Sequence, residues 1–198
     1  GQPTYDVVWM HGVAYVPIFP GPMARPADVA RLGQSPMEFG GVVRLRGVEL
    51  RTPEVTAGSE AIVTLYWEPL APFDAEDFLV ASIVRDEEGL EWSRSHGAPV
   101  GGFLPLSVWR PGMLIRDVQR VRIPAGTPPG SYRLLIGWYS PSTRRTLEAH
   151  RTDGTPVGDM AAIASLRVTP GPVGMPPDDL PTTPADVTWG AIRLEGWH

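Results

Sequence analysis

The sequence contains no cysteine, no lysine and no asparagine. Without cysteine, the chain can form neither a disulfide nor a thiolate metal site. Without asparagine, it has no N-glycosylation sequon. All 17 basic residues are arginine, and the joint lack of lysine and asparagine most simply reflects a GC-rich bacterial genome. The scarcity of asparagine and cysteine also suits a thermophilic source.

Long hydrophobic runs and an excess of positive charge are absent as well. No apolar run approaches the roughly 20 residues that a membrane span needs, so no span is expected in this chain. The net charge of −5 disfavours nucleic acid as a partner, because such proteins present a basic surface. The chain begins at Gly1 rather than methionine, which would fit a removed signal peptide and an extracytoplasmic location.

Glycine and proline are abundant, with 22 and 23 residues, and they divide the chain into many short segments, as in all-β folds. The clearest segment follows the Gly- and Pro-rich turn at 125–130. There Tyr132, Leu134, Ile136 and Trp138 alternate as large apolar residues on one face of a strand. With the preceding strand, 114–123, it predicts the central antiparallel pair of a β-sandwich.

The other strands are expected around this pair. Segments 41–50, 61–67, 78–84 and 161–168 read as strands, with Gly47 marking a bulge in the first. In 61–67 the predicted inward residues are Val63, Leu65 and Trp67. A hairpin turn is predicted at 86–89, and a long loop from 93 to 112, which would be functional or well packed.

The predicted organisation has four parts. Residues 1–37 form an N-terminal extension with short edge strands, 38–168 the sandwich, and 169–187 a proline-rich linker. Residues 188–198 form one extra terminal strand, since PADV at 26–29 recurs at 184–187 and GVVRLRG at 41–47 recurs as GAIRLEG at 190–196. This strand either begins a repeat or pairs with another copy, which would allow a homodimer or a tandem domain.

Tyr132 carries a fold-specific signal. Gly130 to Leu134 resembles the tyrosine corner of immunoglobulin-like sandwiches, with Leu134 where antibody domains carry cysteine and Trp67 as the core tryptophan. We therefore predict an all-β, antiparallel immunoglobulin-like sandwich, with a jelly roll as the alternative.

Three blocks support a family resemblance: LYWEPLAP at 65–72, GGFLPLSVWRPG at 101–112 and IPAGTPPGSYRLLIGWYSP at 123–141. In this order they resemble the soluble β-sandwich domain at the C-terminus of bacterial multi-pass membrane glycosyltransferases of the dolichyl-phosphate-mannose mannosyltransferase type, a domain also found in exported proteins. The resemblance covers about residues 38–168. It implies an accessory domain outside the membrane, with the chemistry in a membrane part that this chain lacks.

No catalytic or metal motif stands out. His11, His96, His150 and His198 are scattered and form no close ligand pair, so no metal site is predicted. The acidic runs 74–77 and 86–88 could bind calcium, but such runs more often form solvated turns. The sequence has no Gly-x-Ser-x-Gly elbow, Ser95-His96 does not make a triad, and no glycine loop has phosphate-binding spacing. No cofactor is expected.

The seven tryptophans are the remaining candidates for function, because large flat rings stack on sugar faces. Trp67 and Trp138 alternate with core positions, so we predict structural roles for them beside Tyr132. The predicted ligand-binding residues flank or lie in the long loop: Trp92, His96, Trp109 and Arg110. For the two tryptophans, packing of the loop onto the sandwich is the competing interpretation.

The sequence therefore favours a non-catalytic extracytoplasmic module that binds carbohydrate or another cell-envelope component. The alternative is a structural or assembly module that pairs through its terminal strand. A glycoside hydrolase ranks last, because no facing carboxylate pair can be singled out among 22 acidic residues.

Overall fold

The computed structural model describes residues 36–73 and 77–171, together with residues 23, 24, 27 and 29 and the backbone of four terminal strands. The strands are β1 (Val8–Met10), β2 (Val13–Tyr15), β3 (Met37–Phe39), β4 (Val43–Leu50), β5 (Glu54–Thr56), β6 (Glu60–Pro69), β7 (Leu79–Arg85), β8 (Glu91–Gly97), β9 (Ile115–Arg122), β10 (Gly130–Ser140), β11 (Arg145–Leu147), β12 (Ala149–Arg151), β13 (Pro156–Gly158), β14 (Ala161–Thr169), β15 (Thr183–Trp189) and β16 (Ile192–Trp197). Two short 3₁₀ turns, η1 (Pro99–Gly102) and η2 (Leu106–Val108), lie between β8 and β9. No helix in the described residues is long and apolar enough to cross a membrane.

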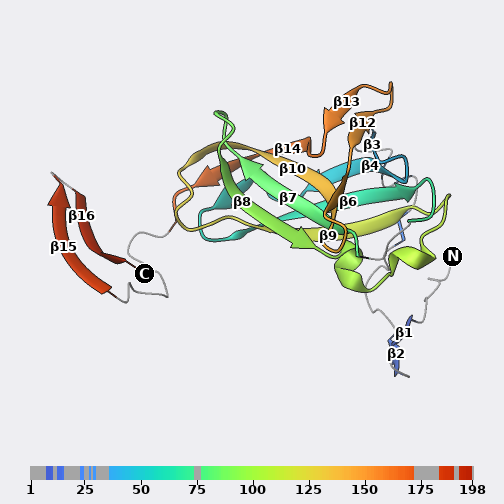
Figure 1. The fold of residues 1–198 in the computed structure, drawn as a ribbon, viewed down its shortest axis with the longest axis horizontal. Helices are drawn as coiled ribbons and strands as arrows, with labels where there is room; N and C mark the ends of the chain where they lie inside the picture. The colour runs from blue at the N-terminus through green and yellow to red at the C-terminus, as the bar shows by residue number, and fades with distance from the viewer. Residues whose placement is uncertain are drawn as a thin grey trace.

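Two β-sheets pack face to face to form the body of the molecule (Figure 1). One has the strand order β5–β14–β10–β7–β8, and the other has the order β13–β12–β3–β4–β6–β9. The orders β4–β6–β9 and β14–β10–β7 match A–B–E and G–F–C of the immunoglobulin fold. Every described pairing is antiparallel except that of β5 with β14. The predicted immunoglobulin-like sandwich is therefore confirmed over the jelly-roll alternative.

The core lies between the two sheets and includes the residues that alternation marked as inward. Val63, Leu65 and Trp67 of β6 are fully buried, as are Leu134, Ile136 and Trp138 of β10. The rings of Trp67 and Trp138 meet edge to face, with centroids 5.0 Å apart, so the two sheets are joined through these two indoles. Both tryptophans, for which we predicted structural roles, thus lie fully buried in the core.

The tyrosine corner is also confirmed. Tyr132 is buried at the start of β10, and its hydroxyl donates a 2.7 Å hydrogen bond to the carbonyl oxygen of Pro128, four residues upstream. The predicted bulge at Gly47 is present as a shift in the pairing of β4 with β6. One detail differs: Trp67 lies on the strand that corresponds to B, whereas antibody domains carry their core tryptophan on C.

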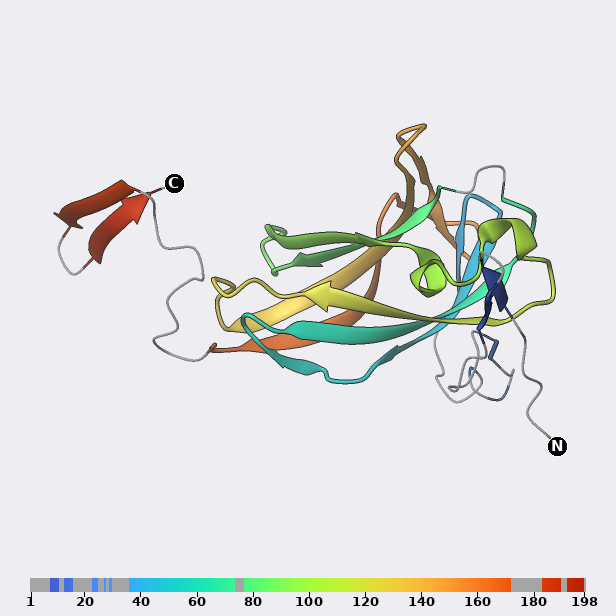
Figure 2. The same ribbon diagram turned by 90° about the horizontal axis from the view of Figure 1, so that it is seen from below.

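The predicted central pair is wrong. Strand β9 pairs with β6, and β10 pairs with β7 and β14, so β9 and β10 belong to opposite sheets. The connection 123–129 crosses between the sheets, as Figure 2 shows from below. Its three prolines lack the N–H groups that a tight hairpin ladder uses. The seven residues between the strands are long enough to span the roughly 10 Å that separates packed sheets.

The predicted loop 93–112 begins later than expected, because β8 continues to Gly97. From Ser93 onward, both faces of this edge strand are polar. Arg94 and His96 lie opposite Ile83 and Ala81 of β7, on one face, and Ser93 and Ser95 occupy the other. A strand without apolar alternation cannot be recognised by period-2 patterning.

The terminal strands form two hairpins. The short strands expected near the N-terminus are present as β1 and β2, which pair with each other. Near the C-terminus, the sequence predicts one strand at 188–198, whereas the structure has two, because β15 occupies the end of the predicted linker and pairs with β16. Pro184 lies at a register shift in this pairing, where a residue without an N–H is tolerated.

Candidate functional site

The outer face of the β10–β7–β8 sheet is the part of the body where side chains of several elements converge. Because Ile136 and Trp138 point into the core, their neighbours Gly137 and Tyr139 point outward. Gly137 pairs with Ala81 of β7, and Ala81 pairs with His96 of β8. These cross-strand partners share the outer face, which places His96 and Tyr139 on one surface.

A groove of about 690 Å³ runs over this surface. The side chains that matter for its chemistry are Arg85, Arg94, His96, Tyr139, Asp159 and Met160. Asp159 and Met160 follow β13, and they form a wall directly above Gly137. A Cβ atom at Gly137 would lie 2.3 Å from the carbonyl oxygen of Asp159 and 2.6 Å from Sδ of Met160. Only glycine therefore allows this wall to approach the sheet.

Two rings lie side by side in the groove. The imidazole of His96 and the phenol of Tyr139 have centroids 5.5 Å apart, at 49° to one another. Both residues line the groove. Their apolar ring faces and polar edges suit a ligand that carries both C–H and O–H groups.

The charges in the groove are unevenly paired. Arg94 donates to both carboxylate oxygens of Glu91, from Nε at 2.7 Å and from Nη2 at 2.8 Å. This bidentate pair lowers the pKa of Glu91. Arg85 has only a distant ion pair with the same carboxylate, 3.8 Å from Nη2 to Oε2. The carboxylate of Glu91 is therefore a close partner of Arg94 and a distant partner of Arg85.

One buried hydrogen-bond donor without an acceptor also lies here. Among the described residues, three buried side-chain polar atoms have no hydrogen-bond partner: Arg85 Nε, Trp138 Nε1 and Thr127 Oγ1. Of these three residues, Arg85 has its side chain at the groove, whereas the indole of Trp138 lies in the core. Because a buried donor without a partner is costly, Nε of Arg85 marks a place where a ligand acceptor would be stabilising.

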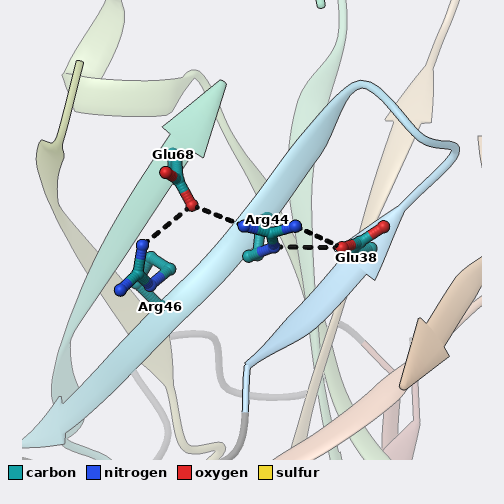
Figure 3. A network of polar contacts seen from close by, with 4 residues as sticks. All are labelled: Glu38, Arg44, Arg46 and Glu68. Carbon is teal, nitrogen blue, oxygen red and sulfur yellow. Dashed lines mark hydrogen bonds and ion pairs between the residues drawn. The ribbon is translucent and has the colours of Figure 1, made fainter. Parts of the chain in front are cut away.

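The outer face of the opposite sheet behaves differently, as Figure 3 shows. Arg44 lies between two carboxylates, donating to Glu38 at 2.6 Å and to Glu68 at 3.0 Å. Arg46 donates to the same Glu68 at 3.0 Å. The contact with Glu38, followed by that with Glu68, raises the pKa of Arg44. The arginines and carboxylates of this network are paired with one another, so they are less available to bind a ligand.

The predicted ligand-binding residues do not gather at one place. Trp109 is fully buried, with its ring 6.0 Å from that of Trp138 and its Nε1 donating to the carbonyl oxygen of Leu104, so the prediction of a binding surface there is wrong. The turn η2 folds the indole inward. Arg110 is exposed, and its guanidinium donates to the carbonyl oxygens of Ser107 and Trp109.

Trp92 and His96 both lie on β8 but have different surroundings. Trp92 is half-buried against the core, and its Nε1 donates to Asp86 at 2.7 Å. Of the four predicted residues, only His96 lines the groove. The sequence did not indicate Arg85, Tyr139 or Asp159, because no local pattern shows that three strands and the β13–β14 connection meet.

The described residues Asp77 and Asp86 of the acidic runs serve as local hydrogen-bond acceptors, whereas residues 74–76 lie outside the described part of the chain. Asp86 accepts from Trp92 Nε1 and from the backbone N–H of Leu90, and these bonds lower its pKa. Asp77 accepts from Ser142 and Ser140, which lowers its pKa in the same way. No cluster of three or more potential metal ligands is found in the part of the chain that the structure describes.

Comparison with known proteins gives limited likeness. No protein family and no curated protein matches this chain. A solved structure of the C-terminal domain of wzt has a TM-score of 0.45 and 13% identity, over 75% of this chain and 81% of that one. A Niemann-Pick type C2 protein from Japanese carpenter ant has a TM-score of 0.32 and 12% identity, over 69% and 96%. At these values neither likeness assigns the chain to a family.

Proposed function

We propose that this chain is a non-catalytic, extracytoplasmic accessory module that binds carbohydrate in the groove on the outer face of β7, β8 and β10. The observation that carries the proposal is the convergence of two rings, His96 and Tyr139, with the guanidinium groups of Arg85 and Arg94 in one groove. Rings stack on the C–H faces of sugars, and arginine and carboxylate groups bond the hydroxyls.

The size and charge of the groove support binding rather than hydrolysis. Its volume of about 690 Å³ lies within the range of roughly 300–1,000 Å³ that is usual for ligand sites. Glycoside hydrolysis ordinarily takes two carboxylates that face each other. Of the described residues that line the groove, Asp159 alone is acidic.

The sequence resemblance supports the setting. A β-sandwich appended to a membrane glycosyltransferase, or exported by itself, would lie outside the cytoplasmic membrane near envelope glycans. Under this proposal the chain holds a glycan in place while another protein or domain performs the chemistry.

A glycan array screened with the full chain and with Tyr139→Ala tests the proposal. We expect binding to at least one glycan class and its loss in the variant. Phe103→Ala is the matched control, because Phe103 is 60% exposed but does not line the groove. No binding to any glycan, or equal loss in both variants, would overturn the proposal.

A further inference from the structure

We infer that the groove selects an anionic sugar and that Arg85 is the residue that receives the carboxylate, phosphate or sulfate group of the ligand. The inference rests on the proposed function and adds the class of glycan to it.

The pairing of the two arginines carries the argument. Glu91 contacts Arg94 through both oxygens at 2.7 and 2.8 Å, whereas its only contact with Arg85 is 3.8 Å long. Arg85 therefore holds a positive charge with room for a second partner. Bidentate binding of a planar or tetrahedral anion is what a guanidinium does best.

An unpaired donor points in the same direction. Nε of Arg85 is buried without a hydrogen-bond partner, and Arg85 lines the groove. This atom can only donate. An anionic group offers it a charged acceptor, whereas a neutral sugar offers only hydroxyls, which donate as well as accept.

The opposite sheet provides an internal comparison. Arg44 there has two carboxylate partners at 2.6 and 3.0 Å, and Arg46 has one at 3.0 Å. Arg44 and Arg46 are thus closely paired with carboxylates on one outer face, whereas Arg85 on the other outer face is not. The arginine that lacks a close partner is one that lines the groove.

The test uses the full chain and immobilised glycans with matched backbones: galacturonate oligosaccharides, phosphorylated mannosides and sulfated galactosides, each beside its neutral parent. We expect at least one acidic set to bind roughly tenfold or more tightly than its parent, and Arg85→Gln to remove about that advantage. The three sets distinguish carboxylate, phosphate and sulfate.

Two further variants separate this role from general surface charge. Arg133→Gln removes the same charge at a neighbouring position. Arg133 is exposed and pairs with Arg85 across the strands, but it does not line the groove. This variant should therefore bind glycans as the unchanged protein does. Glu91→Gln removes the competing carboxylate and should raise affinity for the acidic set.

The Glu91 variant keeps the test decisive even if Arg85→Gln fails to fold. Equal binding of acidic and neutral glycans, or equal losses in the two arginine variants, would overturn the inference while the proposed function stands. Absence of binding to every glycan would overturn both.

Discussion

The indole of Trp67 donates a 3.1 Å hydrogen bond to the carboxylate of Asp117, and both side chains are fully buried between the sheets. Asp117 also accepts from Gln119 Nε2 at 2.9 Å and from the backbone N–H of Val100 at 2.8 Å. Val100 has a φ of 55°, which a β-branched residue rarely adopts. The buried acid therefore holds the η1 turn in a strained conformation.

Replacement of Asp117 by asparagine should change how stability depends on pH. Burial raises the pKa of Asp117 above its ordinary value of 3.8, against the lowering effect of its three hydrogen bonds. The native state then binds the proton more tightly than the unfolded chain. The resulting stabilisation is complete below the unfolded pKa and is lost as the pH rises through the raised one.

We therefore expect the free energy of unfolding of the protein, relative to that of Asp117→Asn, to decrease as the pH rises above the ordinary aspartate pKa of about 4. Urea unfolding of both proteins at several pH values measures this difference. A difference that increased with pH would mean that the hydrogen bonds outweigh burial.

Tyr132→Phe should lower the free energy of unfolding by roughly 1–2 kcal/mol, because it removes a buried hydrogen bond to the carbonyl oxygen of Pro128. Tyr139→Phe removes a hydroxyl from the outer face of the same strand and serves as the control. Thermal unfolding of both variants gives the comparison. Equal midpoints would count against a stabilising role for the corner.

Gly137→Ala should destabilise the protein by about 1–3 kcal/mol, because the new methyl group would overlap the backbone of Asp159. The wall of the groove would have to move, so glycan binding should weaken as well. Gly126→Ala is the matched control, since a Cβ there meets no atom within 4 Å. The account would fail if Gly137→Ala changed neither the free energy of unfolding in denaturant nor the binding on the glycan array.

The C-terminal hairpin gives a prediction about assembly. Because β16 pairs with β15 of its own chain, the full chain and a chain ending at Pro170 should have the same oligomeric state. Light scattering on the two proteins measures their solution mass. A dimer seen only with the full chain would instead favour the alternative interpretation, an assembly module that pairs through its terminal strand.

Strand identity followed well from sequence where one face of the strand is buried. Alternation placed Val63, Leu65 and Trp67 correctly, and the Tyr132 motif indicated the immunoglobulin-like order. The part of β8 from Ser93 onward was not predicted as a strand, because neither face of that part is apolar. The partners of β9 and β10 were misassigned because adjacency in sequence says nothing about which sheet a strand joins.

The site could not be predicted in the same way. The groove depends on Arg85, His96, Tyr139 and Asp159, which come from three strands and a connection. Trp109 looked accessible because it lies in a Gly- and Pro-rich segment, yet η2 turns its ring onto Trp138. A tryptophan in a loop is uninformative until the path of the backbone is known.

The parallel pairing of β5 with β14 has a kinetic consequence. It joins residues 54–56 to residues 167–169, so the short strand β5 has no partner in its sheet until nearly the whole sandwich has been synthesised. Closure over so long a stretch is slow, and during translation this edge would stay open to other strands. The order of synthesis therefore makes β14 the last strand to join the sandwich and the strand that links β5 to the rest of its sheet.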